Sequence, residues 1–211
     1  MLAASRKLIL KILLLFTLTL ILVLGGAYAW SDFFRYWVHD LTGHNRIDAV
    51  AMGSSSILSL PRDYFTECQT LARRGFGSGT LGHLSRYLDY SPLPDSLSLV
   101  VVYAGENDLV YGNSVPQIMD RFDTLADRLS QRFPQAEIYI LKAKLAPARS
   151  DYHEGMTALN QALDTLDSIP RVTVVGSTLS RQVSPRYYLP DGVHLNRKGY
   201  DLFLEGVPRS C

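Results

Sequence analysis

The side chains that suit nucleophilic chemistry in this chain fall in four short segments. Each segment combines glycine, which permits a tight turn, with hydroxyl, amide, carboxyl or imidazole groups. The segments are Gly53-Ser54-Ser55-Ser56, Gly75-Phe76-Gly77-Ser78-Gly79-Thr80, Gly105-Glu106-Asn107-Asp108 and Asp191-Gly192-Val193-His194. A serine needs an adjacent base to become a nucleophile. His194 is the candidate base, because Asp191, three residues earlier, is close enough to orient its ring.

Attack of a serine on an ester carbonyl generates an oxyanion, and an oxyanion needs fixed hydrogen-bond donors. The side-chain amide of Asn107 is one candidate donor. The backbone N–H groups of Ser55 and of residues 77–79 are others. The four segments together therefore contain every part that acyl transfer requires.

Each segment taken alone has a structural interpretation. Gly-Ser-Ser-Ser and Asn-Asp are common as turns or helix caps, and a lone histidine is more often structural than catalytic. The glycine-rich segment 75–80 lacks the Gly-Lys-Ser/Thr ending of a phosphate-binding loop. What favours a shared site is the position of the four segments relative to the predicted strands.

Apolar runs of strand length alternate with segments of helical period, which predicts an α/β fold with a parallel sheet. The expected strands are residues 47–52, a short one before Arg74, 97–103, 136–141 and 172–175. The expected helices are residues 60–71, 80–88, 115–133, 151–166 and 196–204. In open parallel sheets ligands bind beyond the carboxyl ends of the strands. The four segments are therefore expected at one edge of one sheet.

These residues resemble the SGNH hydrolase superfamily, also called GDSL-type lipases and acylhydrolases, whose four blocks supply Ser, Gly, Asn and His in that order. The match covers about residues 47–205. It implies Ser55 as the nucleophile in a Gly-Ser-Ser-Ser variant of the first block, Asn107 as an oxyanion donor, and the Asp191 and His194 pair of the last block. It also implies a three-layer α/β/α domain with a flavodoxin-like five-stranded parallel sheet.

The second block departs from the family pattern, which is approximately Arg-Gly-Phe-Gly-Gly-Ser-Thr. Ser78 stands where the oxyanion glycine belongs. A backbone N–H survives this exchange, so we expect Ser78, together with Ser55 and Asn107, to form the oxyanion hole. Serine adopts a positive φ less readily than glycine, which leaves Gly79 as the alternative donor.

Composition narrows the partners of this 211-residue chain. Lys and Arg total 21 against 20 Asp and Glu, and no basic cluster is longer than Arg73-Arg74, so nucleic acid is not an expected partner. No His, Asp and Glu spacing indicates a metal site, and no cofactor is expected. Arg149, in the segment 142–149 after the fourth expected strand, is interpreted as part of a solvated loop rather than as a substrate contact.

Residues 1–29 are expected to be a membrane anchor or a signal segment. Arg6 and Lys7 precede an apolar run, and 18 residues counted to Ala29 reach the lower limit of a membrane span. Ala27-Tyr28-Ala29 also fits a signal peptidase site, which leaves secretion after cleavage at Ala29 as the alternative. Either way the positive-inside bias places the domain outside the cytoplasm. Residues 30–46, rich in aromatic side chains, are expected to be a stalk or linker before a hydrolase domain at 47–211.

The expected activity is a serine esterase that cleaves a small-molecule, lipid or glycan ester. Two alternatives use the same fold: a cell-envelope O-acyltransferase that passes the acyl group to a sugar hydroxyl, and a non-catalytic envelope binding protein. Fold alone does not select among substrates. Cys68 and Cys211 either form a disulfide in an oxidising compartment or remain separate thiols.

Overall fold

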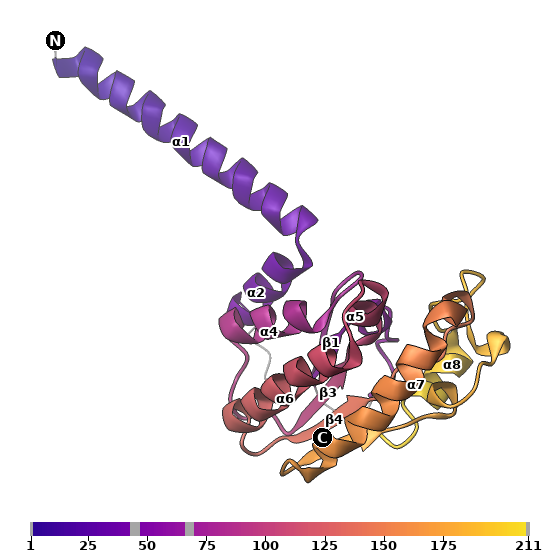
Figure 1. Cartoon of the computed structure of the whole chain (residues 1–211). Coiled ribbons are helices and arrows are strands. Elements are labelled where there is room, and N and C mark those ends of the chain that lie inside the picture. The colour runs from indigo at the N-terminus through magenta and orange to yellow at the C-terminus, as the bar shows by residue number, and fades with distance from the viewer. Residues whose placement is uncertain (1, 43–46, 66–69, 210–211) are drawn as a thin grey trace. The chain divides into compact units, whose positions relative to one another are not determined.

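The structure is a computed structural model that describes residues 2–42, 47–65 and 70–209 (Figure 1). The chain divides into two units, Met1–Thr42 and Gly43–Cys211. The first unit holds two helices, α1 (Leu2–Trp30) and α2 (Asp32–Thr42). The second unit holds the sheet and all four candidate segments.

Five parallel strands form one sheet in the order β2-β1-β3-β4-β5, which is the flavodoxin-like order. The strands are β1 (Ala49–Gly53), β2 (Leu71–Gly75), β3 (Leu99–Tyr103), β4 (Glu137–Leu141) and β5 (Val172–Val175). Every residue of β1 and β3 is buried, as expected of central strands covered on both faces. The α/β class and the parallel sheet predicted from the sequence are therefore confirmed.

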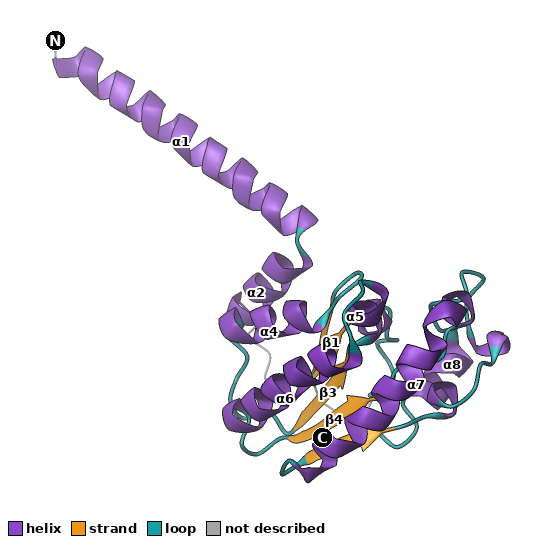
Figure 2. Ribbon diagram, viewed as in Figure 1, coloured by secondary structure: helices purple, strands orange, loops and turns teal. Residues whose placement is uncertain are grey.

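Helices connect the strands (Figure 2). The α-helices of this unit are α3 (Ser55–Leu58), α4 (Leu81–Tyr90), α5 (Glu106–Val110), α6 (Val115–Arg132), α7 (His153–Ala162) and α8 (Arg197–Phe203). Short 3₁₀ helices are η1 (Pro147–Tyr152), η2 (Leu163–Ser168), η3 (Thr178–Ser180) and η4 (Pro185–Tyr187). The α-helix α6 begins with a complete capping box, in which the side chains of Ser114 and Gln117 each accept from the backbone N–H of the other.

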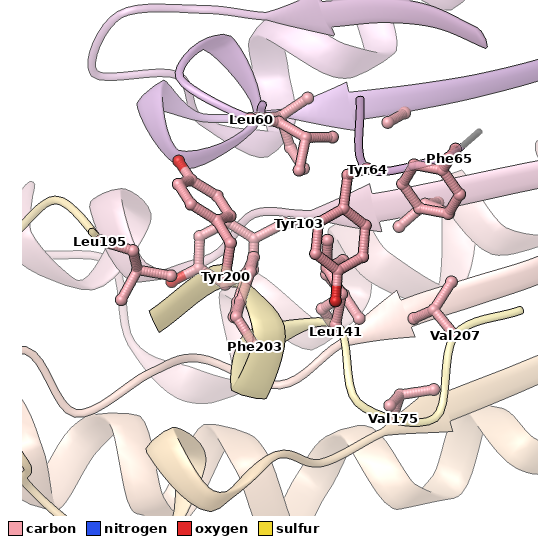
Figure 3. Packing of buried hydrophobic residues seen from close by; sticks show 14 of the residues in the cluster. Leu60, Tyr64, Phe65, Tyr103, Leu141, Val175, Leu195, Tyr200, Phe203 and Val207 are labelled. Atoms are coloured by element: carbon pink, nitrogen blue, oxygen red, sulfur yellow. The ribbon is translucent and has the colours of Figure 1, made fainter. Parts of the chain in front are cut away.

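One face of the sheet packs against α8 and the segment after α3. Tyr103 and Phe203 meet edge to face there, with ring centroids 4.7 Å apart (Figure 3). The cluster also contains Leu60, Tyr64, Phe65, Leu141, Val175, Leu195, Tyr200 and Val207, all buried. This packing ties the last helix to the turn that follows β1.

The opposite face of the sheet packs against α4, α6 and α7. Successive strand residues point to opposite faces, so the buried residues Val50, Val100 and Val102 face away from α8. In Figure 2, α6 and α7 lie along the near side of the strands. The apolar stripe predicted for the helix at 115–133 is buried, and it comprises Ile118, Phe122, Leu125, Ala126 and Leu129. The domain therefore has three layers.

The ends of the three neighbouring strands β2, β1 and β3 are in register. Gly53 pairs with Gly75 on one side and with Tyr103 on the other. A Cβ on Gly53 would collide with the carbonyl oxygen of Tyr103, and a Cβ on Gly75 with the backbone of Leu58. Only glycine permits this close approach, and it brings the segments that follow the three strands to one edge.

The prediction of a helix at residues 60–71 is wrong. Residues 60–65 form an irregular segment with a turn at 62–63, and Leu71 already belongs to β2; residues 66–69 lie outside the described part of the chain. Pro61 disfavours a helical conformation at Leu60, so the helix that follows β1 is the four-residue α3. The apolar residues Leu60, Tyr64 and Phe65, whose spacing suggested a helix, are instead core anchors of an irregular segment.

The N-terminal apolar segment is helical, and its described side chains are exposed on all sides, as at Leu14, Phe16 and Leu22. A search of the described residues finds no helix with the length and apolar character needed to cross a membrane. The anchor or signal segment at residues 1–29 stays a prediction of the sequence. Cys68 and Cys211 lie outside the described residues.

Candidate active site

Ser55 begins α3 directly after β1, at a sharp turn from strand to helix. Ser54 is fully buried and its backbone N–H donates to the carbonyl of Tyr103 at 3.0 Å, which fixes the turn against β3. Ser55 itself is partly exposed. The first N–H groups of a helix have no intrahelical acceptor, so the N–H of Ser55 is available beside its own hydroxyl.

His194 and Asp191 lie next to Ser55 in the structure. Nε2 of His194 is 3.0 Å from Oγ of Ser55, and Nδ1 of His194 is 2.7 Å from Oδ2 of Asp191. With its Nδ1 proton directed at the carboxylate, the imidazole presents Nε2 as an acceptor to the Ser55 hydroxyl. The structure therefore brings the three residues singled out in the sequence into one continuous hydrogen-bonded chain.

The turn that carries Asp191 is held through α8, the helix that follows it. Asn196 caps α8 by accepting from the N–H of Gly199 at 3.0 Å, and Tyr200 on α8 donates to the carbonyl of Ser56 at 2.7 Å. The hydrogen bond from His194, followed by the N–H groups of Val193 and His194, lowers the pKa of the Asp191 carboxyl to about 2. Asp191 is therefore ionised at neutral pH, as an orienting carboxylate must be.

Ser78 adopts a left-handed backbone conformation, with φ of 52°. Glycine adopts this conformation readily, and here a serine occupies it. The N–H of Gly79 donates to the carbonyl of Phe76 at 3.0 Å and is thereby committed to the turn. Among the hydrogen bonds between described residues, none uses the N–H of Ser78. Ser78, rather than the alternative Gly79, retains a free backbone donor in this segment.

Asn107 and Asp108 clamp the second segment to the third. The Asn107 amide donates from Nδ2 to the carbonyl of Gly79 at 2.8 Å, and Asp108 accepts from the N–H of Leu81 at 3.1 Å. The other oxygen of Asp108 accepts from Arg121 on α6 at 3.1 Å. An amide nitrogen carries two hydrogens, so Nδ2 of Asn107 keeps a second hydrogen for a ligand.

The family model of GDSL-like lipases and acylhydrolases matches residues 25–202, which is most of the chain. The chain belongs to this family. It is accordingly an ester-bond hydrolase.

Solved structures with the same fold come from several bacteria. A Streptococcus pneumonia protein described provisionally as a platelet activating factor has 20% identity and a TM-score of 0.72, over 82% of this chain and 88% of its own. A GDSL-like lipase of Bacteroides thetaiotaomicron has 16% identity and a TM-score of 0.64, over 81% and 92%. A Clostridium thermocellum family 3 carbohydrate esterase has 14% identity and a TM-score of 0.56, over 76% and 92%. Comparison with the curated proteins finds no match.

Beneath the surface of this acylhydrolase, Glu106 forms the centre of a buried polar cluster that the sequence does not reveal. Its side chain is 1% exposed, and it comes from the position before Asn107. Oε2 accepts from Lys144 at 2.9 Å and from Tyr103, and Oε1 accepts from Ser54 at 3.3 Å. The cluster joins the first segment, the third segment and the loop after β4.

Lys144 and Arg149 correct the interpretation of residues 142–149 as a solvated loop. Lys144 is fully buried, and the Arg149 side chain is 18% exposed. Nη2 of Arg149 donates to Oδ1 of Asn107 at 2.9 Å, and Nη1 lies 3.7 Å from Oε1 of Glu106. Two basic residues after the end of β4 were the available signal, but their buried partner Glu106 comes from α5, after the end of β3.

Glu106 is ionised because two cations share it. Burial alone raises the pKa of its carboxyl, but Lys144 and then Arg149 outweigh burial and bring the pKa below its ordinary value. Burial lowers the pKa of Lys144, and Glu106 opposes that shift while Arg149 adds to it. Burial and the charge of Glu106 raise the pKa of Tyr103, which stays a neutral donor to the carboxylate.

The described residues include no group of three or more His, Cys, Asp or Glu side chains placed to hold a metal ion. The arrangement of Ser55, His194 and Asp191 with several free donors is instead suited to attack on a carbonyl carbon and to binding of the resulting oxyanion.

Proposed function

We propose that this acylhydrolase cleaves a carboxylic ester through an acyl-enzyme on Ser55. The hydroxyl oxygen of Ser55 attacks the carbonyl carbon while its proton passes to Nε2 of His194. Asp191 holds the imidazole in the required tautomer and stabilises the imidazolium that forms. The proton then passes to the departing alcohol as the bond from carbon to oxygen breaks.

Water then hydrolyses the acyl-enzyme, with His194 acting first as base and then as acid. Nε2 of His194 takes a proton from water, the hydroxide attacks the acyl carbon, and Ser55 leaves with the proton returned from the imidazolium. In both halves negative charge collects on the carbonyl oxygen. We assign its binding to the N–H groups of Ser55 and Ser78 and to Nδ2 of Asn107.

The observation that carries this proposal is the continuous chain from Ser55 through His194 to Asp191, with distances of 3.0 and 2.7 Å. Serine is inert at its own pKa, and this chain is the arrangement that removes its proton during attack. A non-catalytic binding protein would have no use for it.

The test is hydrolysis of p-nitrophenyl acetate together with labelling by a fluorophosphonate and mapping of the labelled peptide. The label is expected on Ser55, and Ser55→Ala is expected to lower kcat by about 10⁴-fold or more, with an unchanged melting curve. Ser54→Ala is the matched control and is expected to lose far less. Label on Ser54, or a Ser55→Ala variant that keeps roughly a tenth of the rate, would overturn the assignment.

The natural acyl donor and acceptor follow from a second measurement on the same protein. Esters of increasing acyl length and acetylated sugars define the donor, since lipid and glycan esters both suit an esterase of this fold. Adding a sugar alcohol as a competing acceptor separates hydrolysis from transfer. A transferred acyl group at the expense of free acid would make the protein an O-acyltransferase that works through the same acyl-enzyme.

Location outside the cytoplasm stays a prediction of the sequence. It depends on Arg6 and Lys7, which precede the apolar run. A fusion of alkaline phosphatase to the C-terminus reports it, because that enzyme is active only after export. An inactive fusion in cells that accumulate the intact chain would contradict the prediction.

A further inference from the structure

Arg149 contacts the proposed oxyanion donor from behind. Its Nη2 donates to Oδ1 of Asn107 at 2.9 Å, on the side of the amide opposite to the nitrogen that is to bind the oxyanion. Nδ2 of the same amide donates to the carbonyl of Gly79 at 2.8 Å. Both ends of the Asn107 amide are therefore held within the protein, and one hydrogen of Nδ2 is left over.

These two bonds permit only one orientation of the amide. Rotation of the Asn107 side chain by half a turn would place the NH₂ group against the guanidinium of Arg149, which is also only a donor. It would place Oδ1 against the carbonyl of Gly79, which is only an acceptor. Each mismatch would set two donors or two acceptors against each other in a buried place, which is unfavourable. Without Arg149, only the bond to Gly79 would distinguish the two orientations.

The guanidinium of Arg149 is itself fixed. Nη1 is buried without a hydrogen-bond acceptor among the described residues and lies 3.7 Å from the ionised Glu106, an ion pair rather than a hydrogen bond. The backbone before Arg149 is anchored as well: the N–H of Ala148 donates to the carbonyl of Gly192 at 3.1 Å, in the turn that carries His194. The Arg149 fork is thus placed by the third and fourth segments at once.

We propose that Arg149 is a positioning residue for this hydrolase: it holds and polarises the Asn107 amide so that Nδ2 faces the oxyanion, and Glu106 holds Arg149. The proposal rests on the function proposed above. A cation at the carbonyl end of an amide withdraws electron density from its nitrogen, which makes Nδ2 a stronger donor. The benefit is largest when full negative charge develops on the substrate oxygen, so it lies in the transition state.

Arg149→Met removes the charge and the fork at similar side-chain length. With p-nitrophenyl acetate as the probe, kcat is expected to fall by about 10–100-fold and KM to change by no more than about twofold, because losing the support of a donor costs less than losing the donor. Arg149→Lys keeps a charge but not the forked guanidinium. Its kcat is expected to lie between those of the unchanged protein and of Arg149→Met. Arg128→Met, on α6 in an ion pair with Asp89, is the matched control.

A double-mutant cycle separates this role from direct contact with substrate. If Arg149 acts through Asn107, adding Arg149→Met to Asn107→Ala is expected to change kcat by no more than about threefold. A full additive loss in that background, or a main effect on KM, would overturn the proposal. Should Arg149→Met fail to fold in a melting experiment, Arg149→Lys carries the same cycle.

Ser55→Ala distinguishes the two failures. If Ser55→Ala and Asn107→Ala lose activity while Arg149→Met keeps it, the proposed hydrolase mechanism stands and the role of Arg149 is wrong. If Ser55→Ala keeps its rate, the proposed hydrolase mechanism itself is wrong, and with it the oxyanion that Arg149 is proposed to help bind.

Discussion

Nδ1 of His194 and Oδ2 of Asp191 lie 2.7 Å apart, while Oδ1 of the same carboxylate accepts from two backbone N–H groups of its own turn. One side chain thereby shapes the turn and orients the ring that the turn carries. The Asp191 side chain is 48% exposed, so its hydrogen bonds, more than burial, set its properties.

Replacing Asp191 by Asn is expected to lower kcat by about 10²–10⁴-fold, because an amide can stabilise the wrong tautomer of the imidazole and carries no charge. The melting temperature is expected to stay close to that of the unchanged protein, since the side chain is half exposed. A variant with full kcat would show that His194 needs no carboxylate.

The pH dependence of stability tests the ionised state of Asp191. The pKa of Asp191 is lowered to about 2, so its stabilising contribution is complete above its ordinary value of 3.8 and is lost only as the pH falls towards 2. We expect the melting temperatures of the unchanged protein and of Asp191→Asn to differ by a small, constant amount from about pH 7 to about pH 4, and the difference to shrink on further acidification. A difference that already shrinks between about pH 7 and pH 5 would contradict an ionised Asp191.

Replacing Asn107 by Ala is expected to lower kcat by about 10²–10³-fold with little change in KM, because its amide binds charge that exists only in the transition state. Asn113→Ala, in the turn after α5, serves as a control that also removes an amide. A main effect on KM would make Asn107 a contact of the ground-state substrate.

Replacing Ser78 by Gly is expected to leave kcat within about threefold, because the backbone N–H that we assign to the oxyanion is retained. Stability is expected to rise by no more than about 1 kcal/mol, since glycine relieves the left-handed strain but gains freedom in the unfolded chain. Thermal melts and p-nitrophenyl acetate kinetics measure the two effects. Loss of most activity would show that the Ser78 hydroxyl takes part.

Replacing Glu106 by Gln is expected to destabilise the domain by about 3–5 kcal/mol, because Lys144 would then be buried without its counter-charge. Adding Lys144→Met is expected to restore part of that loss, and Glu154→Gln on the exposed side of α7 is the control. The pKa of Glu106 is lowered, so its contribution to stability is present above its ordinary value of 4.5 and lost as the pH falls below it. Urea denaturation at several pH values measures both effects.

The sequence predicts the sheet well because burial on both faces leaves long apolar runs. Residues 172–175 match β5 residue for residue, and the expected strand at 97–103 differs from β3 only at its start. The prediction of a helix at 60–71 was wrong because buried apolar residues of an irregular segment, such as Leu60 and Tyr64, can have the same spacing as the apolar face of a helix.

The four candidate segments could be found from residue type and position, since the sequence itself shows glycines and polar side chains at the ends of predicted strands. The buried polar cluster around Glu106 could not be found in this way. Glu106, Lys144 and Arg149 are charged, and charged residues in loops are usually solvated. Their burial depends on a pairing between the ends of β3 and β4, which only the register of the folded sheet creates.

Ser55 and His194 are separated by 139 positions, and the helix that supports His194 is the last one of the chain. A ribosome that adds 5–20 residues per second needs roughly 7–28 s to pass from one to the other. Throughout that interval the emerging polypeptide carries its serine without an acceptor for the hydroxyl proton. On the proposed mechanism the protein is synthesised in an inert form, and a chain interrupted before α8 would contain the serine without the base that activates it.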